Sequence, residues 1–183
     1  MILVAACLFL FLGGKPAPAS ETPQFEQPLL ITSAGQSAEV QLAAVLAKRA
    51  ALDYSLSKLA KSPALQGMKT LVLSLGASLK GLGAAGIDVA QERGRIEELL
   101  AYARKRDIPV LCMHLGGESR RGQLSDEFIS SFLPYAKLVI VVKSGNKDGF
   151  FTNLCEQNKI PMIEVERAAD ALSPLQQVFS PEK

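Results

Sequence analysis

Short apolar runs alternate with helical patterns along the chain from Pro28 onward. Two of the runs, residues 70–75 (TLVLSL) and 138–142 (LVIVV), are apolar on both faces rather than at every second position. Strands of this kind belong to parallel sheets that helices cover on both surfaces. The pattern predicts six strands, at residues 29–33, 54–56, 70–75, 108–115, 138–142 and 161–165.

The intervals between the predicted strands have the composition and spacing of helices. Residues 37–51 are rich in Ala and Leu, which are strong helix formers. Asp88 followed by Gln91 is a capping-box pattern, and the helix that it opens has an apolar stripe at i, i+3, i+4 and i+7 from Ile96. Further helical segments are predicted at residues 62–67, 125–133, 149–158 (capped by Asp148) and 168–179.

This alternation predicts a doubly wound α/β fold, a three-layer sandwich of flavodoxin-like or Rossmann-like type with about six mainly parallel strands. We expect the strand order 2-1-3-4-5-6, which places the reversal of winding between the first and third strands. Ligands of open α/β sheets bind beyond the carboxyl ends of the strands at this reversal. The predicted ligand site therefore includes the segments 33–37 and 76–86, with the turn after His114 beside them.

The first 27 residues do not follow the alternating pattern. Residues 1–12 are continuously apolar, a Gly-Gly-Lys-Pro break follows, and Ala17-Pro18-Ala19 has the small-x-small spacing that signal peptidase reads. The apolar run is shorter than the roughly 20 residues of a membrane span. We therefore predict a signal peptide at residues 1–19, a flexible leader at 20–27 and a single α/β domain at 28–183.

A signal peptide implies export to the periplasm, the cell surface or the medium, with no stable membrane span after the signal is removed. Cys7 lies in a lipobox-like stretch, but the apolar run continues past it, which argues against lipid attachment. Cys112 and Cys155 remain in the processed chain, and each lies on the apolar side of its predicted element. We expect two buried free thiols, although a disulfide stays open in an oxidising compartment.

Composition narrows the classes of partner and cofactor. The chain has 183 residues, of which 48% are hydrophobic and 21% charged, as in folded domains. The formal net charge is +2, which leaves no basic excess for a nucleic-acid backbone. The single His and three Cys have no metal-ligand spacing, so neither a metal site nor a cofactor is predicted.

Polar residues and glycines concentrate in the loops that follow the strands, at the carboxyl edge of the predicted sheet. Five cations in these loops are expected to form a positive rim that suits a small anion, offset by acids such as Glu92, Glu97 and Glu98 on a helix away from it. The alternative is that the cations are solvated or paired with acids such as Glu118 and Asp148. The candidate ligand-binding residues are Ser33, Gln36, Ser37, Ser78, Lys80, His114, Glu118, Arg120, Arg121, Lys143, Asn146 and Lys147.

His114 is the only imidazole in the chain and stands at the end of a predicted strand. Together with Glu118 it is a candidate acid/base pair for catalysis near neutral pH. The alternative is a core histidine that is hydrogen-bonded to a backbone carbonyl. No Gly-x-Ser-x-Gly elbow accompanies it, and the sequence leaves open whether the protein is an enzyme.

One glycine motif is discounted by its context. Gly81-x-Gly83-x-x-Gly86 matches the dinucleotide fingerprint in its letters. The fingerprint needs its first glycine in the turn at the strand end, and here five residues intervene. The segment is therefore expected to be a glycine-rich loop without a nucleotide.

The leading functional prediction is a small exported protein that binds an anion such as a carboxylate, phosphate or sulfate at the carboxyl edge of the sheet. One alternative is an enzyme that uses His114 as acid/base, with Arg120 or Arg121 holding an anionic substrate. Another is a noncatalytic envelope module whose apolar surface meets a protein partner. The sequence determines neither the ligand nor the oligomeric state.

Several separate motifs carry a resemblance to a known family. They lie at Leu30–Ser37, Lys80–Asp88, Met113–Gly122, Leu124–Asp126 and Val142–Gly149. On these motifs the chain resembles a family of exported bacterial α/β proteins that is catalogued as domain of unknown function 6305. The resemblance covers residues 28–179 and implies a bacterial, extracytoplasmic, single-domain protein, with no implied activity, cofactor or site residue.

Overall fold

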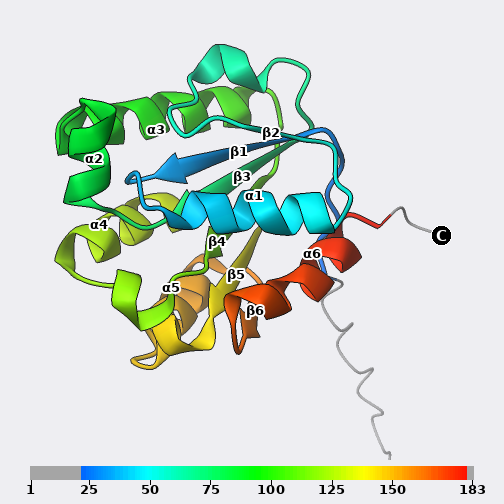
Figure 1. Cartoon of the computed structure of the whole chain (residues 1–183). Helices are drawn as coiled ribbons and strands as arrows, with labels where there is room; N and C mark the ends of the chain where they lie inside the picture. The colour runs from blue at the N-terminus through cyan, green and yellow to red at the C-terminus, as the bar shows by residue number, and fades with distance from the viewer. Residues whose placement is uncertain (1–21, 181–183) are drawn as a thin grey trace, which may run out of the picture.

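The computed structural model describes residues 22–180, and its centre is one sheet of six parallel strands (Figure 1). The strand order β2-β1-β3-β4-β5-β6 confirms the predicted topology. Every pairing is parallel, as the apolar runs predict for strands that are buried on both faces. The strands are β1 (Leu29–Ala34), β2 (Tyr54–Leu56), β3 (Thr70–Leu75), β4 (Val110–His114), β5 (Leu138–Val142) and β6 (Met162–Val165).

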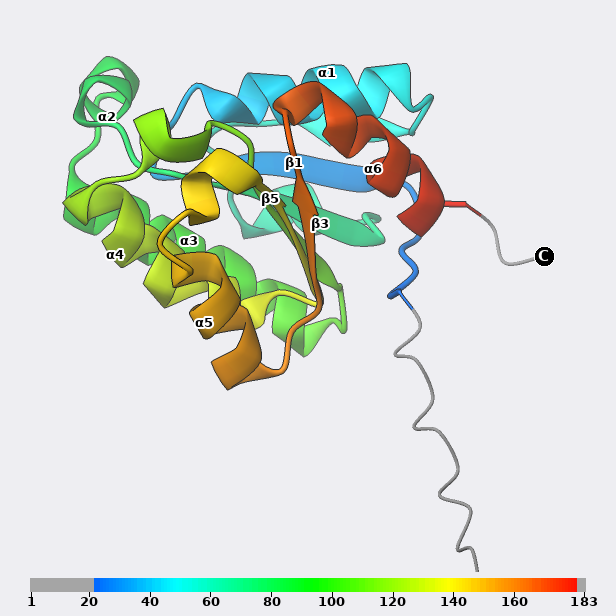
Figure 2. The ribbon, with the colours of Figure 1, turned by 90° about the horizontal axis from the view of Figure 1, so that it is seen from below.

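Helices cover both faces of the sheet, which makes the fold the predicted three-layer sandwich (Figure 2). One face is covered by α1 and α6, and the other by α3, α4 and α5. Short 3₁₀ turns η1 to η5 lie at Ser62–Leu65, Gly117–Arg120, Leu133–Tyr135, Lys143–Asn146 and Ala168–Ala171. The α-helices are α1 (Glu39–Arg49), α2 (Leu79–Ala85), α3 (Val89–Lys105), α4 (Gln123–Phe132), α5 (Phe150–Asn158) and α6 (Leu172–Val178).

The core consists of two apolar layers, one on each face of the sheet. Alternate residues of each strand enter opposite layers, so Leu73 packs toward α3 and α4 while Val72 packs toward α1. The predicted stripe of α3 that begins at Ile96 is buried, and the capping box of Asp88 and Gln91 is formed. These agreements confirm that the hydrophobic period determines which face of each element points inward.

The winding of the chain reverses at β1 and β3. The connection from β1 through α1 leads to β2 on one side, and the connection from β3 through α2 and α3 leads to β4 on the other. The loops after β1 and β3 are joined by the isolated bridge between Gln36 and Ala77. The carboxyl ends of these two strands therefore meet where a doubly wound sheet places its ligand.

Several helix boundaries differ from the sequence prediction, among them those of α2, α4 and α5. The expected loop 76–86 contains α2, whose N-terminus is capped by Ser78, because its side-chain oxygen accepts a hydrogen bond from the Gly81 N–H. Helix α4 begins at Gln123 rather than Ser125, which is buried. Helix α5 begins one residue later than expected, and Asn146 shares its capping with Asp148.

The two cysteines that the structure describes are free and buried, as predicted. Burial raises the pKa of Cys112 well above its ordinary range and raises the pKa of Cys155 to about 11. Both side chains are protonated thiols at neutral pH, and a thiol is a far weaker nucleophile than a thiolate.

The predictions for residues 1–19, including the signal peptide and the status of Cys7, lie outside the described residues and stay predictions. Within residues 22–180, no helix combines the length and the apolar character that a membrane crossing requires.

Residues 22–27, expected to belong to a flexible leader, instead pack against the domain. Phe25 is only 5% exposed, and its ring lies 5.7 Å from the ring of Phe179. The Phe25 N–H donates to the carbonyl of Val178, and Thr70 donates its hydroxyl to the carbonyl of Glu26. The domain therefore begins before Pro28, because this segment covers the amino edge of the sheet.

Replacing Phe25 by Ala is expected to lower the free energy of unfolding by about 3 kcal/mol, since a buried aromatic ring is removed. Urea denaturation of F25A and wild type measures this difference. Leu42→Ala is the matched control, because Leu42 is 43% exposed and a surface truncation changes stability by only about 0.5 kcal/mol. Equal stability of F25A and wild type contradicts the packing of this segment.

Candidate functional site

A cavity of about 550 Å³ lies beside the carboxyl ends of β1 and β3, at the reversal of winding. The loops after four strands contribute to it: those after β1, β2, β3 and β4. Its polar lining consists of three uncharged residues and three cations, and it contains no Asp or Glu. These six residues are Gln36, Ser37, Ser78, Lys58, Lys80 and Arg120.

The backbone of the β1 loop is shaped by a close approach to α2. Gly35 has φ +104° and Gln36 has φ 59°, which turn the chain sharply at the end of β1. The carbonyl of Gly35 accepts a hydrogen bond from the Ser78 N–H at 2.8 Å. A Cβ at position 81 would clash with the carbonyl oxygen of Gln36, so Gly81 is required for packing rather than for a nucleotide.

An ion pair with a fully buried carboxylate holds this loop in place. The Glu92 carboxylate accepts from the Gly35 N–H at 2.9 Å and from the Gln36 side-chain amide at 3.0 Å. Arg95 donates to both oxygens of the same carboxylate at 2.8 Å. Glu92 was expected on a helix away from the cationic rim, and this expectation is wrong because Glu92 lies at the first turn of α3, beside the β1 loop.

Arg95 extends the same network to the neighbouring backbone. Its guanidinium donates to the carbonyl of Ser33 at 2.6 Å and to the carbonyl of Ala60 at 2.7 Å. The Gln36 amide also donates to the carbonyl of Lys58 at 3.0 Å. Two cavity loops, those after β1 and β2, are thus tied to a single buried pair.

Replacing Glu92 by Ala is expected to lower the free energy of unfolding by about 3–5 kcal/mol, because the Arg95 charge stays buried without its partner. Chemical denaturation measures this loss. The control Glu97→Ala removes an exposed carboxylate from the same helix and should change stability by about 0.5 kcal/mol or less. If E92A loses no more free energy of unfolding than E97A, Glu92 does not hold the β1 loop in place.

Glu39, at the start of α1, plays the same part for the loop after β4. Its carboxylate is buried and accepts from the Leu115 and Gly116 N–H groups at 2.8 and 2.7 Å. The Ser37 hydroxyl donates to its other oxygen at 3.2 Å. This carboxylate therefore holds the turn that leads to Arg120.

His114 is fully buried and contacts backbone on both sides. Its Nδ1 lies 2.9 Å from the carbonyl oxygen of Leu75 and 3.6 Å from the Glu39 carboxylate. Its Nε2 lies 3.1 Å from the carbonyl oxygen of Gly117. Both ring nitrogens therefore face backbone carbonyl oxygens rather than a cavity.

This placement matches the core-histidine alternative rather than the acid/base one. His114 lines none of the cavities described for residues 22–180, and Glu118 instead forms an exposed ion pair with Lys147 at 2.6 Å. The two candidates for acid/base catalysis are thus not brought together.

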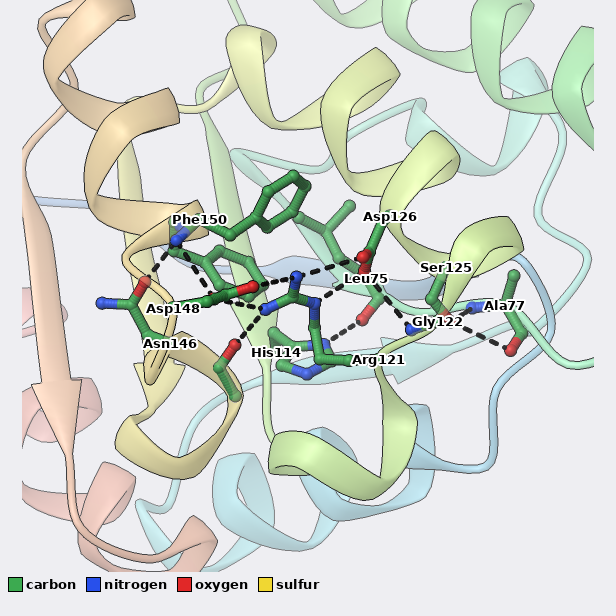
Figure 3. Close-up of polar contacts among 12 residues, drawn as sticks. Leu75, Ala77, His114, Arg121, Gly122, Ser125, Asp126, Asn146, Asp148 and Phe150 are labelled. Carbon is green, nitrogen blue, oxygen red and sulfur yellow. Dashed lines mark hydrogen bonds and ion pairs between the residues drawn. The ribbon is translucent and has the colours of Figure 1, made fainter.

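Arg121 is committed to internal contacts (Figure 3). Its guanidinium donates to both oxygens of Asp126 at 2.6 and 3.0 Å and to both oxygens of Asp148 at 3.1 and 3.0 Å. It also donates to the carbonyl of Gly145 and lies over the Phe150 ring at 4.3 Å. Arg121 therefore clamps α4 to the loop before α5 and is not free to hold a ligand.

The ion pairs of Arg121 with Asp126 and Asp148 shift pKa values in this group of residues. The hydrogen bond from Arg121 is the main cause that lowers the pKa of Asp148 below its ordinary value. The hydrogen bond with Asp126 raises the pKa of Arg121 further above its ordinary range.

A carboxyl with a depressed folded-state pKa stabilises the fold above its unfolded pKa and loses that contribution as pH falls through the folded pKa. Asp148→Asn is therefore expected to be less stable than wild type at neutral pH, and the difference should shrink below pH 3.8. Urea denaturation across pH 2.5–7, at roughly half-unit steps, measures the difference. Glu97→Gln is the control, because Glu97 is exposed on α3; a constant difference for D148N at all pH values contradicts the assignment.

The other predicted residues divide between paired and buried positions. Lys143 pairs with Glu166 at 2.7 Å, and this contact raises the pKa of Lys143. The amide of Asn146 accepts from two N–H groups at the start of α5 and donates to Glu164. The Ser33 hydroxyl is buried and has no hydrogen-bond partner among the described residues.

The expected rim of five cations is thus smaller than the sequence suggests. Three of the five, Arg121, Lys143 and Lys147, pair with carboxylates, as the alternative foresaw. Lys80 and Arg120 line the cavity and have no ion pair within residues 22–180. They are joined by Lys58, which sequence reasoning missed although it follows β2 at the same edge of the sheet.

Two further observations bear on the other predicted classes. Within the described residues, no group of three or more His, Cys, Asp and Glu side chains is placed to hold a metal ion. The large apolar side chains that are exposed there lie on several different elements: Leu42 and Val45 on α1, Leu56 on β2, Leu59 after it, Leu79 on α2 and Tyr135 on η3.

The fold and the cavity define a doubly wound parallel α/β domain with a cationic cavity at the reversal of winding. Residues 26–179 match the family described as a domain of unknown function (DUF6305), and the chain belongs to this family. No curated protein matches the chain.

Among solved structures, the chain is similar to AlinE4, an SGNH-hydrolase family esterase, with 14% identity and a TM-score of 0.31. A mutant of the same esterase has 14% identity and a TM-score of 0.30. Each match covers 88% of this chain and 85% of the other.

Proposed function

We propose that this protein binds a small anion in the cavity at the reversal of winding, beside the carboxyl ends of β1 and β3. The observation that carries the proposal is the charge of the lining: Lys58, Lys80 and Arg120 contribute three cations, and no carboxylate lines the cavity. The other cations of the predicted rim are neutralised by Asp and Glu side chains. A concave site that collects unpaired charge of one sign attracts ligands of the opposite sign.

The position of the cavity supports the same proposal. It lies where the loops after β1 and β3 meet, which is the usual ligand position of an open α/β sheet. Backbone N–H groups of two of the loops that form it donate buried hydrogen bonds to Glu92 and Glu39. The backbone under the cations is thereby held in place before a ligand arrives, which reduces the entropy lost on binding.

Isothermal titration calorimetry with inorganic phosphate, sulfate, citrate and glucuronate tests the proposal. We expect at least one of these anions to bind wild type. Lys80→Ala and Arg120→Ala should each weaken it about tenfold, because a hydrogen bond to a charged group contributes roughly 1.5 kcal/mol or more.

Lys143→Ala is the matched control, because it removes one positive charge from the same edge of the sheet at a side chain paired with Glu166. It should leave the affinity unchanged. Equal weakening in K143A, K80A and R120A indicates an effect of net charge rather than a site. Absence of binding by all these anions and by the two series of alkyl anions described below overturns the proposal.

A further inference from the structure

The wall of the cavity carries apolar surface as well as charge. Leu59, the residue after Lys58, lines the cavity and is 38% exposed. Ala84 and Ala85 of α2 line it as well. An inorganic anion makes no use of this surface, whereas an apolar group that covers it removes it from water.

Helix α2 places the charged and apolar parts of this wall in a fixed order. Its cavity-lining residues are Lys80, Gly81, Ala84 and Ala85, which are spaced by four residues and so share one face. Lys80 and Ala84 are separated by about 6 Å along the helix axis, since each residue rises about 1.5 Å. The first turn of this face is therefore cationic and the second is apolar.

The size of the cavity points in the same direction. Its volume is about 550 Å³, which is within the range of sites for small organic molecules. A water molecule takes up about 30 Å³ in the liquid, and an inorganic anion is only a few times larger. Such an ion alone leaves most of the cavity, and the Leu59 side chain, in contact with solvent.

We propose that the ligand is an organic anion, whose charged group lies beside Lys80 and Arg120 and whose short apolar chain lies against Leu59. This inference rests on the proposed function, because it assigns the class of anion to the same cavity. The apolar chain of the ligand extends along α2 from Lys80 toward Ala84 and Ala85.

The test is calorimetry with two matched series of anions that differ only in chain length. One series runs from acetate to hexanoate, and the other from inorganic phosphate to butyl phosphate. In the series with the preferred charged group, each added methylene should tighten binding by about threefold to fourfold, which is the effect of burying one methylene.

Three variants separate the two parts of the site. Leu59→Asn is expected to reduce the dependence on chain length, because Ala84 and Ala85 still line the cavity, while the shortest anion binds as in wild type. Lys80→Ala should weaken every member of the series by a common factor. Leu42→Asn is the matched control, because Leu42 has a similar exposure of 43% but lies outside the cavity, and it should bind the whole series like wild type.

The outcomes distinguish this inference from the function on which it rests. If the shortest anions bind with the predicted dependence on Lys80 and Arg120 but chain length has no effect, the ligand is a purely inorganic or fully polar anion. The organic-anion inference is then overturned and the anion site stands. A chain-length effect that is as large in L59N as in wild type places the alkyl chain elsewhere and also overturns the inference. If no member of either series binds, and phosphate, sulfate, citrate and glucuronate do not bind either, both proposals are overturned.

Discussion

Two buried carboxylates, Glu92 and Glu39, satisfy the backbone N–H groups that the sheet leaves unpaired at the carboxyl ends of its strands. Glu92 accepts from the Gly35 N–H after β1, and Glu39 accepts from the Leu115 and Gly116 N–H groups after β4. A buried N–H without a partner is strongly destabilising, so these loops depend on the two side chains. The shape of the carboxyl edge follows from this requirement.

The same two carboxylates explain how charge is distributed at this edge. Arg95 offsets the charge of Glu92, and Glu39 accepts hydrogen bonds from two backbone N–H groups and from the Ser37 hydroxyl. Arg121 forms ion pairs with Asp126 and Asp148. Lys58, Lys80 and Arg120 have no ion pair among the described residues, and all three line one cavity at this edge. The charge of the protein as a whole is close to zero. This cavity is nevertheless cationic, because the nearby carboxylates pair with other cations or accept hydrogen bonds from the backbone.

Much of the candidate site was open to prediction from the sequence, and the reasons for the failures are physical. Gln36, Ser37, Ser78, Lys80 and Arg120 were predicted because each follows a strand, and strand ends meet at one edge of a parallel sheet. Arg121 was predicted on the same grounds, but its partners Asp126 and Asp148 lie 5 and 27 residues away. Spacing along the chain does not reveal which of two adjacent arginines points inward. Lys58 was missed because β2 is short and only partly buried, so its loop carried little signal.

The sequence by itself determined the parallel sheet, the order of the elements other than α2, and the buried face of α3. These features depend on hydrophobic period and on local caps, such as the Asp88 and Gln91 pair, which are written within a few residues of each other. Only the tertiary structure decided which charged residues are neutralised and which remain for a ligand. Ion pairing depends on distances of a few ångströms between loops that are far apart in the chain, and no local pattern records them.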